Sequence, residues 1–230
     1  PQRSARVLAL LAGLLIFFAG PSLLRFYTDW LWFGEVGYRS VYATMLRSQG
    51  TLFTIVFVAG FVWLAVNLRL AVGTIRDLRP VFITREGIEV ALPNRHQLQT
   101  LATAAALVVA LLIGLYAAGQ WEVWMAWRNA VPFNQADPLL GRDAGFYVFT
   151  LPFLQFVRGL LQGLIVLAAI GAGAIYFVSG SMSSTFPASF SMTGNARRHL
   201  ALLAAAFLLV LAFGAWLQRA EFLIPAIGAT

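Results

Sequence analysis

The 230-residue chain contains no cysteine and no lysine, and it carries few charges of either sign. Its 16 basic and 9 acidic residues make up 11% of the chain, whereas a soluble domain carries about a quarter. Without cysteine there is no disulfide framework, no thiolate metal site and no cysteine nucleophile. Histidine occurs only at His96 and His199, and no Ser/His/Asp set, phosphate loop or metal-ligand spacing is found. We therefore expect no metal, no other cofactor and no enzymatic activity.

What the chain has in excess is apolar surface. Hydrophobic residues reach 60%, and the mean hydropathy is +0.79. A domain of this size has no interior large enough to hide that much apolar surface, which excludes a soluble enzyme and a disordered chain. The net charge of +7 does not indicate nucleic acid as a partner, because the arginines are scattered between apolar runs and form no basic groove. The composition predicts an integral membrane protein.

Five apolar runs are long enough to cross a hydrocarbon core of about 30 Å, which takes about 20 helical residues. These predicted spans cover residues 7–24, 50–72, 98–119, 151–178 and 200–217. Lipid offers the backbone no hydrogen-bond partners, so each run should be a helix. The predicted fold class is an all-α polytopic transmembrane bundle, with residues 1–230 forming a single transmembrane domain. The first run is longer than a signal-peptide core and lacks a small-x-small cleavage site, which favours an uncleaved anchor.

The arginines also predict the orientation of the bundle, because basic residues collect on the cytoplasmic side. With the N-terminus cytoplasmic and the C-terminus outside, nine arginines lie in inner segments and six in outer segments. The inner ones are Arg3, Arg6, Arg69, Arg76, Arg79, Arg85, Arg95, Arg197 and Arg198; the outer ones are Arg25, Arg39, Arg47, Arg128, Arg142 and Arg219. At the inner start of the fifth span, Arg197 and Arg198 favour contact with anionic lipid.

Aromatic residues gather in the two predicted outer segments. The first segment contains Trp30 and Trp32, and the second places Trp121, Trp124 and Trp127 at the i, i+3, i+6 spacing of a short helix. Amphipathic rings prefer the headgroup layer of a bilayer. We expect these tryptophans to lie at the outer membrane interface. The inner loop 179–195, rich in Ser, Gly and Pro, is predicted to be flexible.

The fourth predicted span contains the one charge well inside an apolar run. Gln155, Arg158 and Gln162 fall at i, i+3, i+7 on one face of the helix. Two interpretations stay open for Arg158: its side chain extends to the outer interface, or it pairs with an acid such as Asp143 or with another subunit.

Beside this polar stripe lie Gly159 and Gly163 in a small-xxx-small pattern that lets helices approach closely. The glycines fit packing inside the bundle or an interface with another helix. Together with the polar stripe they form a candidate helix-docking face: Gln155, Arg158, Gly159, Gln162 and Gly163.

The segment Asp137–Asp143 has two acids six residues apart, which are too few oxygen ligands for a calcium loop of the EF-hand type. Its proline and glycine favour a turn in which the aspartates accept hydrogen bonds from the backbone.

Three strings carry a resemblance to the large bacterial family known as uncharacterised protein family 0182. They are YTDWLWFGEVGYRSVY at 27–42, VPFNQADPLLGRDAGFYVFTLPF at 131–153 and ARRHLALL at 196–203. The resemblance implies a membrane bundle that continues into further spans and a large extracytoplasmic domain, so this chain is expected to be a truncated part of such a protein. It implies no activity and no catalytic residue.

The absence of buried carboxylate relays and cofactor ligands, together with the small-residue helix faces, favours a protein that works by contact. We expect a structural or accessory subunit of a larger complex in the bacterial inner membrane, whose partners are the lipid bilayer and other membrane-protein subunits. The alternative is the N-terminal part of a transporter or channel.

Overall fold

The computed structural model describes residues 20–74, 82–83, 89–90, 94–185 and 189–222. Helices dominate these residues, so the predicted all-α fold class is confirmed. In the described part, the helices long and apolar enough to cross a membrane are α2 (Arg39–Gly73), α3 (Arg95–Ala118), α5 (Leu151–Val178) and α6 (Gly194–Glu221). Of the first predicted span, only residues 20–24 are described, and they are helical; the rest lies outside the described residues. The chain forms two compact units, Pro1–Ser48 and Gln49–Thr230.

In the first unit, the segment predicted as an interfacial loop is helical. One helix covers residues 20–35, the chain turns at Gly37 with a φ of 79°, and α2 begins at Arg39. The helix therefore begins eleven residues before the predicted apolar span, which starts at residue 50. The hydroxyls of Thr44 and Ser48 donate to the carbonyls four residues earlier, at 2.8 Å each, so these polar side chains are satisfied within the helix and do not end it.

Aromatic rings hold the two helices of the first unit together. Phe33 stacks on Tyr42 with the ring centroids 4.9 Å apart, and Phe26 and Trp30 flank the same tyrosine at 6.2 and 6.3 Å. Tyr42 is buried as a result. Trp32, in contrast, is 57% exposed. Part of the aromatic segment is thus the core of a helical hairpin, while its depth in a membrane stays a prediction.

In the second unit, local sequence signals explain where helices begin. Asn94 and Gln97 form a reciprocal capping box at the start of α3. The short helix predicted from the tryptophan spacing is present as α4 (Trp121–Arg128). A single π-helical turn, η1 (Phe146–Thr150), precedes α5, so this helix begins before the predicted residue 151. Pro152 has no N–H for the α-helical ladder, which favours the wider hydrogen bonds of the π turn.

The loop between the last two predicted spans, which was expected to be flexible, contains a β-hairpin. Its strands are β3 (Met182–Thr185) and β4 (Ser189–Met192), with Met182 paired to Met192. Pairing across the hairpin satisfies backbone groups that an irregular loop would leave to water. A smaller hairpin of β1 (Phe82–Ile83) and β2 (Glu89–Val90) lies between α2 and α3. Helix α6 begins six residues before its predicted span, at Gly194.

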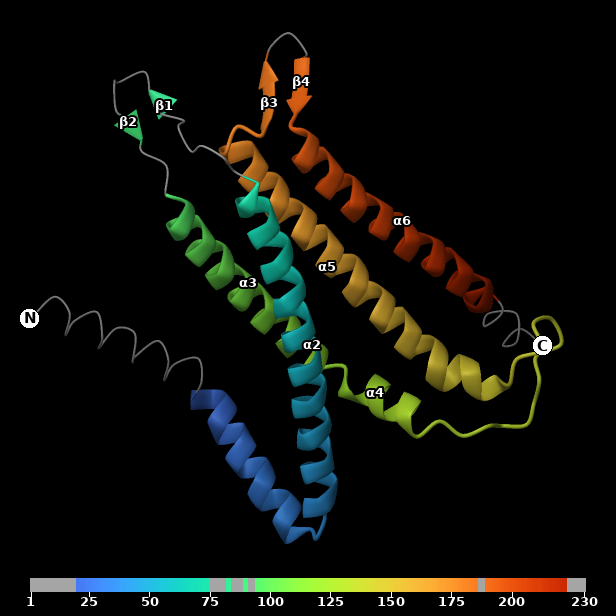
Figure 1. Ribbon diagram of the computed structural model, residues 1–230. Helices are drawn as coiled ribbons and strands as arrows, with labels where there is room; N and C mark the ends of the chain where they lie inside the picture. The colour runs from blue at the N-terminus through green and yellow to red at the C-terminus, as the bar shows by residue number, and fades with distance from the viewer. Residues whose placement is uncertain (1–19, 75–81, 84–88, 91–93, 186–188, 223–230) are drawn as a thin grey trace, which may run out of the picture. The chain divides into compact units, whose positions relative to one another are not determined.

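The long helices of the second unit alternate in direction, and α5 and α6 lie side by side (Figure 1). Trp63 of α2 donates a hydrogen bond of 3.1 Å to the carbonyl of Leu164 in α5. The core consists of aliphatic and small residues from all four helices: Leu64, Ala65, Leu68, Val72, Ala102, Ala106, Ile165, Ala168 and Leu203. Small residues let the backbones approach closely, which is the main source of helix association in lipid.

Candidate functional site

The residues predicted as a docking face on α5 do not all face the same way. Gly159 and Gly163 are exposed, and no atom lies within 4 Å of the position that a Cβ would occupy on either. Arg158 turns toward α6, where a Cβ placed on Gly214 would lie 2.6 Å from its Nε atom. Gln155 and Gln162 are half-buried. Docking itself stays a prediction.

Among the residues that the structure describes, no neighbouring helix packs on Gly159 or Gly163. The glycine of α5 that packs inside the bundle is Gly171, where a Cβ would lie 2.6 Å from Cδ2 of Leu68 in α2. The two open glycines instead begin an exposed stripe at helical spacing along α5. This glycine stripe consists of Gly159, Gly163, Val166, Ile170, Ala174 and Phe177.

Arg158 lies at the contact between α5 and α6. Its Nε atom is buried and has no hydrogen-bond partner among the described residues. The ion pair with Asp143 that the sequence suggested is absent from those residues, because Oδ1 of Asp143 accepts hydrogen bonds from backbone amides instead. A Cβ at position 214 would force the arginine side chain to shift, so this cation is a feature of helix packing.

A polar junction joins three helices near the end where α2 and α5 finish and α6 begins. The Tyr176 hydroxyl lies 2.8 Å from Nδ1 of His199, and Nε2 of His199 lies 3.0 Å from Oδ1 of Asn67. The Asn67 amide donates to the carbonyl of Trp63 at 2.7 Å, which directs its Oδ1 toward the histidine. Since that oxygen only accepts, the neutral ring carries its proton on Nε2, and Tyr176 donates to Nδ1.

We refer to Asn67, Tyr176 and His199 as the three-helix junction. The junction was not predicted from the sequence, in which His199 simply follows Arg197 and Arg198 at a basic helix start. Tyr176 is fully buried and Asn67 nearly so. No spacing signal could have revealed the junction, since its members come from α2, α5 and α6 and lie far apart in the sequence.

The turn expected around Asp137 is confirmed. Its carboxylate accepts hydrogen bonds from the amides of Leu139 and Leu140, at 3.2 and 2.7 Å, and from the Tyr147 hydroxyl at 2.9 Å. Burial alone would raise the pKa of Asp137, but these three hydrogen bonds to the charged form outweigh it, so the pKa lies below its usual value.

Asp143 plays the same structural part at the other end of the turn. Its Oδ1 accepts from the amides of Phe133 and Gly145 at 3.0 and 2.7 Å. These hydrogen bonds lower the pKa of Asp143 and keep it ionised. Both carboxylates therefore hold backbone amides in place, as aspartates that stabilise a turn do.

The tryptophans of the second predicted interfacial segment pack onto the start of α5. Trp127 stacks on Phe153 with the centroids 4.1 Å apart, and Trp124 contacts the same ring at 5.8 Å. Trp121 is half-buried at the first residue of α4. These contacts fix α4 against α5 and leave the depth of the rings in a membrane untested.

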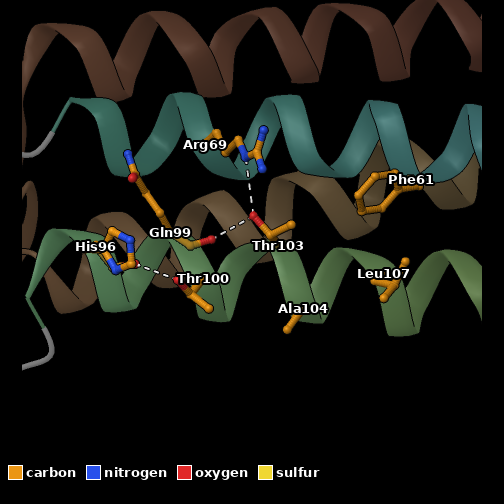
Figure 2. Close-up of a pocket in the computed structure, with 8 residues that line it drawn as sticks. All are labelled: Phe61, Arg69, His96, Gln99, Thr100, Thr103, Ala104 and Leu107. Atoms are coloured by element: carbon orange, nitrogen blue, oxygen red, sulfur yellow. Dashed lines mark hydrogen bonds between the residues drawn. The ribbon is translucent and has the colours of Figure 1, made fainter.

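A cleft of about 650 Å³ lies between α2 and α3. We call it the α2–α3 cleft; Figure 2 shows its lining residues, Phe61, Arg69, His96, Gln99, Thr100, Thr103, Ala104 and Leu107. No site at these residues was predicted from the sequence. No group of three or more His, Cys, Asp or Glu residues in the described ranges is placed to hold a metal ion.

Together, these features define an all-α protein with helices of membrane-crossing length, held together by small residues and one polar junction. The chain belongs to the family described as Uncharacterised protein family (UPF0182), which matches residues 6–230. The resemblance carried by the loop strings is thereby confirmed.

Relatives from distant bacteria match nearly the whole chain. UPF0182 proteins of Rhodococcus jostii (strain RHA1) and Streptomyces coelicolor are 37% and 34% identical over 96% and 95% of this chain. One from Geobacter sulfurreducens is 34% identical over 95% of it. The chain spans only about a fifth to a quarter of these relatives' own length, 22% for the first two and 25% for the third. No solved structure matches the chain.

Proposed function

We propose that the chain is a multi-pass domain of the bacterial inner membrane that works by contact and not by catalysis. In this role it is a structural or accessory subunit, and its glycine stripe binds a membrane-spanning helix of a partner protein. The observation that carries the proposal is the open stripe along α5. Two of its glycines have nothing within 4 Å, although α5 is long and apolar enough to cross a membrane.

A partner helix fits this stripe better than lipid does. Acyl chains gain nothing from a missing side chain, whereas a helix backbone can approach Gly159 and Gly163 closely and gain van der Waals contact. Gln162 lies beside the glycines, and its half-buried amide offers a hydrogen bond worth about 0.6 kcal/mol on average between helices in a membrane. The partner segment should therefore be an apolar helix with small residues facing α5.

The transporter or channel alternative would require polar side chains that line a path through the bundle. Among the described helices, Asn67, Tyr176 and His199 bind one another instead. This mutual satisfaction supports the contact role.

Site-specific photo-cross-linking in bacterial membranes tests the proposal. A photoreactive residue replaces Ile170 on the glycine stripe or Leu208 on α6, and both positions are 63% exposed. We expect the probe at 170 to cross-link to an integral membrane protein of one defined mass, and the probe at 208 to react with lipid only.

The cross-link from position 170 should disappear in the double variant G159L/G163L, because leucine blocks close approach of the partner. The matched control A201L/A205L makes the same change on the exposed face of α6 and should leave the cross-link intact. Lipid adducts alone at position 170 would show that the stripe borders lipid. A protein cross-link that persists in G159L/G163L would show that the partner does not bind at the two glycines.

A further inference from the structure

The α2–α3 cleft changes in chemistry along its length. At one end lie Arg69, His96, Gln99, Thr100 and Thr103, and at the other lie Phe61, Ala104 and Leu107 (Figure 2). We propose that this cleft binds an anionic phospholipid, with the phosphate at Arg69 and an acyl chain along the apolar end.

The guanidinium group of Arg69 reaches across the cleft from α2 to α3. Its Nε donates to Oγ1 of Thr103 at 3.3 Å, and that hydroxyl donates to the carbonyl of Gln99 at 2.8 Å. No residue in the described ranges bonds the two terminal nitrogens of Arg69. A planar guanidinium held by its Nε presents paired N–H donors that match two oxygens of a phosphate.

The depth of the two ends suits an amphiphile. Arg69 lies four residues before the last residue of α2, about 6 Å from the helix end at roughly 1.5 Å per residue. Phe61 lies eight residues further back, about 12 Å deeper on the same estimate. If α2 crosses the membrane, the cation lies near the headgroups and the apolar end lies beside the acyl chains.

The charges around the cleft favour an anion over a zwitterion. Among the described residues, no carboxylate lines it. A second cation, Arg95, lies nearby at the start of α3, where a Cβ placed on Gly73 would be 3.9 Å from its Nη2. The quaternary amine of phosphatidylcholine would be repelled by these arginines, whereas the glycerol headgroup of phosphatidylglycerol carries no cation.

Native mass spectrometry of the full 230-residue chain, freed of lipid in mild detergent, tests the proposal. Phosphatidylglycerol and phosphatidylcholine with identical acyl chains are added separately. We expect phosphatidylglycerol to bind at least about tenfold more tightly, and R69Q to lose about tenfold of that affinity, as for one charge-assisted hydrogen bond. The matched variant R128Q removes an arginine from α4 and should bind as wild type does.

Two further variants separate the parts of the site. Ala104→Phe fills the apolar end and should weaken binding of phosphatidylglycerol without touching Arg69. Thr103→Val removes the hydroxyl that accepts from Nε of Arg69 and should also weaken the binding of phosphatidylglycerol. If R69Q does not fold, as judged by far-UV circular dichroism, T103V replaces it in the test.

Four results would overturn the proposal. The first is equal binding by R69Q and R128Q. The second is an unchanged affinity in A104F. The third is competition by soluble glycerol phosphate as strong as that by the lipid, which would indicate a site for free phosphate. The fourth is loss of binding in R197Q/R198Q but not in R69Q, which would place the lipid at the start of α6.

Discussion

Replacing Tyr176 with phenylalanine removes a single oxygen from the three-helix junction. The ring remains buried between α5 and α6, but Nδ1 of His199 loses the hydroxyl that lies 2.8 Å away. Hydrogen bonds between membrane helices contribute about 0.6 kcal/mol on average and about 1.7 kcal/mol at most. Because Tyr176 is fully buried, no water can take the place of its hydroxyl. We therefore expect Y176F to lower the free energy of unfolding by about 1 to 1.7 kcal/mol.

The assay is unfolding of the purified chain by titration with dodecyl sulfate in mixed micelles, followed by far-UV circular dichroism. The matched control is Y116F, because Tyr116 on α3 is 61% exposed and should lose almost nothing. A double-mutant cycle with H199F isolates the bond, and we expect a coupling of about 0.6 to 1.7 kcal/mol. Equal destabilisation by Y176F and Y116F, or a coupling of zero, would refute the junction.

Two further predictions follow from the packing and the acid turn. Gly214→Ala places a Cβ 2.6 Å from Nε of Arg158 and should lower the free energy of unfolding by about 1 to 3 kcal/mol in the same titration. The control G173A, where the space is open, should leave this free energy unchanged or raise it by up to about 1 kcal/mol. Equal effects would show that the arginine moves freely. The pKa values of Asp137 and Asp143 are lowered in the folded turn. Both carboxylates are therefore expected to stabilise the turn at a pH above their unfolded pKa of about 4. This stabilisation should be lost as the pH falls through their pKa values in the folded chain. Hydrogen exchange of the Leu140 and Gly145 amides should accelerate in acid beyond its intrinsic pH dependence, and no such increase would contradict the carboxylate role.

The existence of the helices could be predicted from the sequence, but not all of their limits. The apolar runs of α3, α5 and α6 lie within the observed helices apart from a residue or two at the ends, because lipid forces apolar runs to close their own hydrogen bonds. Hydropathy reports only the part of a helix that suits the membrane core. It therefore missed residues 39–49 of α2, whose hydroxyls bond to the helix itself, and the first turns of α6 with their arginines.

Which faces of the helices meet could not be predicted. In a soluble helix the apolar side marks the core, but a spanning helix is apolar all round and carries no such signal. Thus Gly159 and Gly163 could not be distinguished from Gly171, although only Gly171 packs on α2. The junction of Asn67 with His199 likewise depends on how separate helices are arranged, since these residues are 132 positions apart.

The central claim is that α2, α3, α5 and α6 cross a membrane, and labelling from one side tests it most directly. Single cysteines at Thr84 and Asn134 lie in the segments before and after α3, and the chain has no cysteine of its own. With an impermeant maleimide, we predict labelling at 134 in intact cells and at 84 only after the membrane is opened. Labelling of both positions, or of neither, in intact cells would mean that α3 does not cross the membrane, and labelling of 84 alone would reverse the proposed orientation.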